Sequence, residues 1–99
     1  MDFARHLKSQ INIVEVVGER VKLRRIGATP RYTGLCPFHT EKTPSFHVHQ
    51  DHQFYYCFGC QAKGDVYNFL MQMDGFTFYE AMKSLADYVC RQWNATHGP

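Results

Sequence analysis

Four residues near the middle of the chain have the types and the spacing of a zinc site. Cys36 and His39 form a Cys-x-x-His pair, and Cys57 and Cys60 form a Cys-x-x-Cys pair seventeen residues further on. Each pair lets two side chains reach one ion, and the segment between the pairs can fold as a hairpin that brings them together. Three thiolates and one imidazole fill a tetrahedron, which is typical of a structural site. The sequence therefore predicts one structural Zn²⁺.

Two other uses of these cysteines fit the pattern less well. Four cysteines could pair as two disulfides, but three of them have the spacing of metal-binding pairs, with a histidine at the fourth position. This leaves Cys90 as an odd thiol, which a disulfide framework would not predict. A redox-active pair at Cys57 and Cys60 is expected at the start of a helix in a βαβ unit, whereas here the pair follows a predicted hairpin. A thiol oxidoreductase is therefore kept only as a third hypothesis. Cys90 is expected to be a partly buried, small apolar residue of the last helix.

The composition is that of a single folded domain. The chain has 99 residues, of which 44% are hydrophobic and 15% aromatic, enough for two packed layers. We place the domain at residues 1–94 and the start of a linker at residues 95–99. The formal net charge of +2 identifies no class of partner. No stretch resembles a signal peptide or a membrane span, so a cytoplasmic protein without membrane contact is expected.

Two short helices are predicted before the zinc segment. Apolar residues recur every three or four positions through residues 2–17. Asn12 and Glu15 have the spacing of a capping box. The first helix is therefore expected to end near Gln10, and the second to run over residues 13–17.

Two β-hairpins should deliver the two metal-binding pairs. Alternating apolar and polar residues predict strands over residues 19–25 and 31–35, joined by a turn, and over residues 46–49 and 53–57. In the second hairpin Phe46 and Val48 are expected to face the core, with the intervening histidines on a polar face. In its last strand Phe54 and Tyr56 are expected inside, which leaves Tyr55 exposed.

Two further helices should follow the second metal-binding pair. Asp65 is the expected N-cap of a helix that ends at Gly75. Thr77 and Glu80 form another capping box, ahead of an apolar stripe that reaches Trp93. Helices that flank a small antiparallel sheet make an α+β domain with the metal at one end of the sheet.

The sheet also suggests how the domain binds a partner. Cations could follow the phosphates of a nucleic acid while exposed rings stack on unpaired bases, so single-stranded nucleic acid fits better than duplex. The alternative is that the cations form a solvated edge and the rings belong to the core. The candidate nucleic-acid-binding residues are Lys22, Arg24, Arg31, Tyr32, Lys42, Tyr55 and Lys63. No catalytic residue is predicted, because the chain has no paired carboxylates of a metal site and no glycine-rich phosphate loop.

Several segments together resemble a known family. The segments Gly34–His39, Glu41–Phe46 and Gln53–Cys60, with Gly64–Asp65 following, closely resemble the N-terminal zinc-binding domain of bacterial replicative DNA primases of the DnaG type. The resemblance implies a zinc ribbon, in which a small antiparallel sheet holds one zinc ion at one end. It also implies that Cys36, His39, Cys57 and Cys60 are the zinc ligands.

The resemblance further implies a function and partners. The domain would bind a single-stranded DNA template and support the start of RNA primers. An RNA polymerase domain, in cis or in trans, would join the nucleotides, and the replicative helicase would be an indirect partner. Lys42, Pro44 and Ser45 would lie in a loop beside the DNA-contacting surface. An alternative is a module that docks on the primase catalytic domain or on the helicase.

Two departures from the family pattern affect these expectations. Gln61 stands where the family often has glycine, which makes the backbone after the second pair less permissive. The turn over residues 27–30 is longer than usual, which leaves the register of Arg31 and Tyr32 open.

Overall fold

The computed structural model describes residues 2–40 and 42–97, with side chains described as far as Trp93. Glu41, which is part of the resemblance above, lies outside these residues. The helices are α1 (Phe3–Ser9), α2 (Ile13–Gly18), α3 (Val66–Asp74) and α4 (Phe78–His97). The strands are β1 (Arg24–Arg25), β2 (Arg31–Gly34), β3 (Phe46–His49), β4 (Phe54–Cys57) and β5 (Lys63–Gly64).

The helix boundaries follow the capping residues of the sequence. Asn12 caps α2 by accepting a hydrogen bond from the N–H of Val14. The side chain of Asp65 accepts from the N–H of Asn68, whose side chain accepts from the N–H of Asp65 in return. Gly75 ends α3 in the left-handed conformation, with φ of 69°.

The last helix begins as expected and ends later. Thr77 and Glu80 form the reciprocal capping box, because each side chain accepts a hydrogen bond from the N–H of the other residue. Helix α4 then continues past Trp93 to His97, about one turn further than the apolar stripe indicates. None of the described helices is both long and apolar enough to span a membrane.

The strands form one antiparallel sheet in the order β1-β2-β3-β4-β5. Both predicted hairpins are present, but the first strand is shorter than residues 19–25, since only Arg24 and Arg25 pair with β2. The fifth strand was not predicted. It pairs Lys63 and Gly64 with β4 and so leads from the second metal-binding pair into α3.

The register divides the sheet into two faces. Residues directly opposite in an antiparallel pair point to the same side. The inner face carries Tyr32, Gly34, Phe46, Val48, Tyr55 and Cys57. The outer face carries Arg24, Arg31, Thr33, His47, His49, Phe54, Tyr56 and Lys63.

The exposed position predicted for Tyr55 is wrong. The alternation in β4 is present, but Tyr55 and Cys57 are fully buried while Phe54 and Tyr56 are half-buried on the outer face. The hydroxyl of Tyr55 donates a hydrogen bond to Gln72 Oε1 at 2.9 Å, so its polar end is also used inside the fold. Tyr55 therefore belongs to the core and cannot stack on a base.

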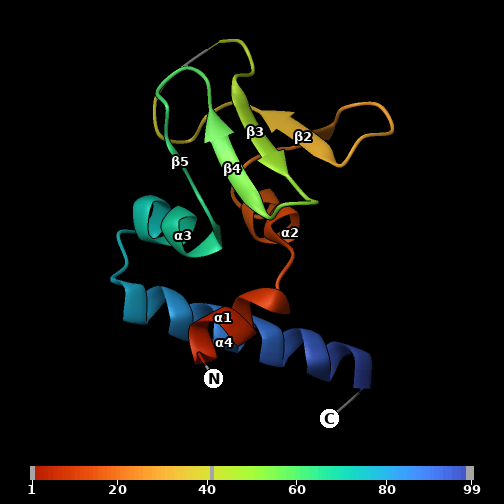
Figure 1. The fold of residues 1–99 in the computed structure, drawn as a ribbon, viewed down its shortest axis with the longest axis vertical. Helices are drawn as coiled ribbons and strands as arrows, with labels where there is room; N and C mark the ends of the chain where they lie inside the picture. Colours follow the sequence, from red (N-terminus) through yellow and green to blue (C-terminus); the bar gives the residue numbers. More distant parts are fainter. Residues whose placement is uncertain (1, 41, 98–99) are drawn as a thin grey trace.

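The helices cover only the inner face of the sheet. Helices α2 and α3 pack against the strands, and α1 and α4 lie beyond them, as Figure 1 shows with the sheet at one end of the molecule and α4 at the other. The core between these layers includes Ile13 and Val17 of α2, Phe69 of α3 and Leu85 of α4, each at most 1% exposed. The described helices leave the outer face of the sheet uncovered.

Two glutamines adopt left-handed backbone conformations and are expected to respond oppositely to glycine. Gln61 has φ of 64° and Gln53 has φ of 55°. Gln53 also accepts a hydrogen bond from the N–H of Ile13 at 2.7 Å and donates one to the carbonyl of Gln50 at 2.6 Å. Glycine relieves backbone strain at either position but removes these two bonds only at Gln53.

We therefore expect Gln61→Gly to raise the free energy of unfolding by about 0.5 kcal/mol. Gln53→Gly should lower it by about 1–3 kcal/mol, because it leaves buried polar groups without their partner. Thermal melting of the two zinc-loaded variants would measure both shifts. Destabilisation by Gln61→Gly would show that its side chain, and not its backbone, matters at this position.

Candidate metal centre

The register of the sheet brings the two metal-binding pairs to one place. Gly34 at the end of β2 lies opposite Phe46 at the start of β3, which in turn lies opposite Cys57 at the end of β4. Cys36 follows the first of these positions, and Cys57 is the last of them. The two pairs therefore meet at one end of the sheet because of strand pairing, not because of their distance in sequence.

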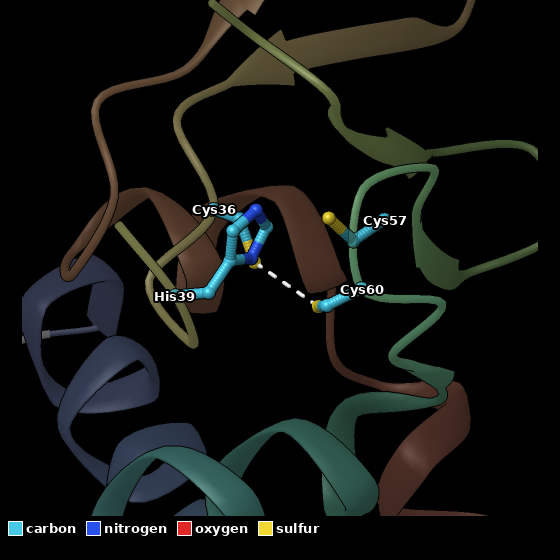
Figure 2. Close-up of side chains that lie close together, drawn as sticks. All are labelled: Cys36, His39, Cys57 and Cys60. Atoms are coloured by element: carbon cyan, nitrogen blue, oxygen red, sulfur yellow. Dashed lines mark hydrogen bonds between the residues drawn. The ribbon is translucent and has the colours of Figure 1, made fainter. Parts of the chain in front are cut away.

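The four predicted ligands form one cluster. The sulfur atoms of Cys36, Cys57 and Cys60 and a ring nitrogen of His39 all lie within 4.8 Å of one another. Figure 2 shows the imidazole and the three sulfur atoms converging from two loops on the same space. It is the one such group of histidine, cysteine and acidic residues found in the part of the chain that the structure describes.

The geometry fits a tetrahedral zinc ion. Sγ of Cys36 and Sγ of Cys60 are 3.7 Å apart. Two thiolates bound tetrahedrally to zinc at the usual Zn–S distance would be separated by about 3.8 Å. Three sulfurs and one imidazole nitrogen also match the donors that zinc prefers in closed structural sites. These residues are positioned to bind one zinc ion.

The surroundings of Cys57 favour its deprotonated, thiolate form more than the surroundings of Cys36 do. Burial raises the pKa of the Cys36 thiol to about 12. Burial acts in the same direction on Cys57, but hydrogen bonds from Ser45 and from the N–H groups of Cys60 and Gly59 outweigh it and lower that pKa to about 7. Zinc must displace the proton of each thiol that it binds, so its affinity should fall as the pH falls.

The first metal-binding pair is also anchored to the core. The ring of Phe38, between Cys36 and His39, lies 6.1 Å from Phe46 and 5.9 Å from Phe69, both in edge-on arrangements. Such aromatic contacts add to the free energy gained from burial. The position of the metal loop is therefore coupled to the packing of β3 and α3.

Because Gly59 has no side chain, it leaves room for the His39 ring. A Cβ atom at residue 59 would lie 2.9 Å from Nε2 of His39 and 3.0 Å from Oγ of Ser45. A side chain at residue 59 would therefore require the His39 ring or the Ser45 hydroxyl to shift. Glycine lets the second pair approach the histidine of the first without such a shift.

The predicted DNA-binding residues are spread over several surfaces. Arg24, Arg31 and Lys63 lie on the outer face of the sheet. Tyr32 is on the inner face, half-buried against the core, and Lys42 is exposed in the loop after the first metal-binding pair.

The outer face also carries several aromatic and imidazole rings. His49 stacks on Phe54 with 4.3 Å between ring centres and 6° between planes. Phe58, which is 67% exposed, lies edge-on to Tyr56 at 4.9 Å and to His47 at 5.0 Å. The sequence signal was available, because β4 has aromatic residues at consecutive positions and one row of them had to face outward.

Two of these rings are neutral near pH 7. Burial and the nearby charge of Arg31 lower the pKa of His47. The same two causes, in the same order, lower the pKa of His49. Both histidines therefore act as uncharged rings on the outer face.

Cys90 takes no part in the metal cluster. It lies on α4 and is exposed, so the expectation of a partly buried residue is wrong. Cys90 lies on a side of α4 that does not face the core, whereas the adjacent Val89 packs against the core.

An antiparallel sheet whose two metal-binding loops meet at one end defines a zinc ribbon. The chain belongs to the CHC2 zinc finger family of DnaG-type zinc ribbons, which it matches over residues 1–98. This confirms the fold class and the family inferred from the sequence.

Relatives of known identity agree with this assignment. The chain is 52% identical over 88 residues to the DNA primase of Clostridium acetobutylicum, covering 89% of this chain, and 50% identical over 80 residues to that of Thermotoga maritima, covering 81%. The crystal structure of the Aquifex aeolicus primase, comprising zinc-binding and RNA polymerase domains, superposes with a TM-score of 0.83 at 34% identity over 90% of this chain.

The matches cover a small part of each relative. The chain spans 14% of the length of the two primases and 22% of the Aquifex chain. The 99 residues therefore correspond to the zinc-binding domain and not to a catalytic one.

Removal of zinc should unfold at least residues 31–62, because the free energy of metal binding is partly free energy of folding. Circular dichroism and thermal melting before and after chelation, with loss of the metal confirmed, would measure this. An unchanged melting curve would contradict the structural role. His39→Cys keeps a fourth donor and should retain more zinc than His39→Ala.

Gly59→Ala should weaken zinc binding by displacing His39, whereas Gly18→Ala should not. Gly18 has no atom within 4 Å of an added Cβ and no positive φ, so it controls for the effect of the substitution itself. Competition with a chromophoric chelator would compare their zinc affinities. Equal affinities would show that the loop relaxes without cost.

Proposed function

We propose that the outer face of the sheet binds single-stranded DNA template and supports the start of RNA primers by a primase. The family match supports this assignment over a module whose main role is to dock on a catalytic domain or a helicase. In the cell the domain would act in the cytoplasm beside an RNA polymerase domain, in cis or in trans, and indirectly with the replicative helicase.

The observation that carries the proposal is the pairing of rings and cations on one open face. Across the strands, one row of this face runs Arg24, Thr33, His47, Tyr56 and Lys63. The row therefore has a cation at each end and rings between them. Cations can hold phosphates while rings stack on bases, which requires bases that are not paired in a duplex.

A second row extends the same surface. Arg31 lies opposite His49, and His49 lies opposite Phe54. Because His49 and Phe54 are already stacked and neutral, little side-chain entropy is lost when a base adds to the stack. Lys42 lies in the loop that leaves the metal and is proposed as a further phosphate contact.

Tyr56→Ala should weaken binding of an oligothymidine by about 1–3 kcal/mol through loss of stacking. Tyr79→Ala is the matched control, because Tyr79 is an exposed tyrosine of α4, away from the sheet. Fluorescence anisotropy at low salt would measure both affinities. Equal losses in the two variants would contradict a site on the outer face.

Arg31→Ala should reduce the slope of log affinity against log salt by about 0.7, the value for one phosphate contact on a single strand. Lys83→Ala on α4 removes an exposed cation elsewhere and should leave the slope unchanged. If the chain bound no single-stranded oligonucleotide at low salt, the proposed function would be wrong.

A further inference from the structure

A groove of about 710 Å³ lies at the β1 edge of the sheet. One wall is the chain that enters β1, residues 20–24, and the other is residues 33–35 with Pro37 and Pro44. The two walls meet closely at Gly34, where an added Cβ would lie 2.6 Å from the carbonyl oxygen of Lys22. The groove is therefore a product of the backbone and not only of side-chain positions.

The apolar lining of the groove is aliphatic. Val21 and Leu23 contribute from one wall, and Leu35 contributes from the other together with the two prolines. Leu35 is 49% exposed, which is a large exposure for a leucine beside a buried metal ligand. The described lining contains no aromatic ring, in contrast to the outer face.

Three cations also line the groove, and two of them are available. Arg20 is engaged by Asp74, with 2.8 Å between Nη2 and Oδ2, and by Glu19 at 3.5 Å. Lys22 and Arg24 are exposed, and neither forms an ion pair within residues 2–40 and 42–97. The groove thus combines aliphatic side chains on both walls with two exposed cations on one of them.

We propose that this groove binds an acidic segment of a protein partner, whose aliphatic side chains enter the groove while its carboxylates pair with Lys22 and Arg24. Charge complementarity requires an anionic ligand. Bases gain most by stacking on rings, which the outer face offers and the groove lacks, whereas aliphatic and proline walls suit the apolar side chains of a peptide. The groove adjoins the proposed DNA surface and shares Arg24 and Thr33 with it.

The test uses the zinc-loaded chain and a fluorescent peptide of alternating glutamate and leucine. The peptide should bind saturably, and backbone amide NMR should show the shifts concentrated in residues 20–24 and 33–37. A peptide with serine in place of leucine should bind about tenfold more weakly, because the aliphatic contribution is lost.

Two variants and two matched controls test whether the peptide binds in the groove. Leu35→Ser and Lys22→Glu should each weaken binding of the peptide by about tenfold. Ile26→Ser replaces an aliphatic residue that is 38% exposed and lies outside the groove lining, and Arg5→Glu reverses an exposed charge of α1. Both control variants should bind the peptide with the same affinity as the unmodified chain. Lys22→Glu alters only an exposed side chain, so it remains informative if Leu35→Ser loses zinc.

Three results would overturn the proposal. The first is absence of peptide binding, and the second is a set of NMR shifts on another surface. The third is displacement of the peptide by oligothymidine together with weaker oligonucleotide binding by Leu35→Ser, which would assign the groove to DNA. Failure of the peptide test with intact, Tyr56-dependent oligonucleotide binding would reject the groove alone and leave the proposed function standing.

Discussion

The convergence of four donor atoms at one end of a small sheet is the constraint on which the rest of this domain depends. Those donors come from two segments that strand pairing brings together, the loop after β2 and the end of β4 with the turn that follows it. A bound zinc ion links them directly. Its effect reaches the helices because Phe38 packs on β3 and α3. The metal therefore stabilises the geometry of the sheet as well as the two loops.

A sheet held in this way can leave one face uncovered. All four helices lie on the side of the inner face, so the hydrophobic core does not need the outer face. An uncovered sheet of aromatic residues would normally invite aggregation. Here cations lie at the ends of the rows of rings, and the rings pack on one another, as in the stack of His49 on Phe54. The arrangement keeps the rings ordered for a ligand while the cations keep the surface hydrated.

Much of the fold could be predicted from local signals in the sequence. The capping residues Asn12, Asp65 and Thr77 and the terminating Gly75 mark helix ends through hydrogen bonds and backbone geometry that depend on few neighbours. The zinc ligands could be predicted for a similar reason, since two short pairs of donors have few other uses. Gln61 was identified as restrictive, and it indeed has a left-handed backbone.

The features that were missed depend on long-range pairing. Phe54, Tyr55 and Tyr56 are all aromatic, so alternation alone could not show which row of β4 is buried. The pairing of Cys57 with Phe46 decides it, because a metal ligand opposite a core residue places Tyr55, two residues earlier, on the same inner face. Strand β5 was missed because a pair as short as Lys63 and Gly64 has no periodicity to detect.

The edge strand β1 shows how closely the two open surfaces of the domain are connected. Arg24 belongs to a row of the outer face and also lines the groove, and its position relative to β2 depends on the contact between the segment before it and Gly34. Any ligand that displaces this segment must move Arg24 as well. Because an effect of one ligand on the affinity of another is reciprocal, occupation of the groove and of the outer face would be energetically coupled through this one strand.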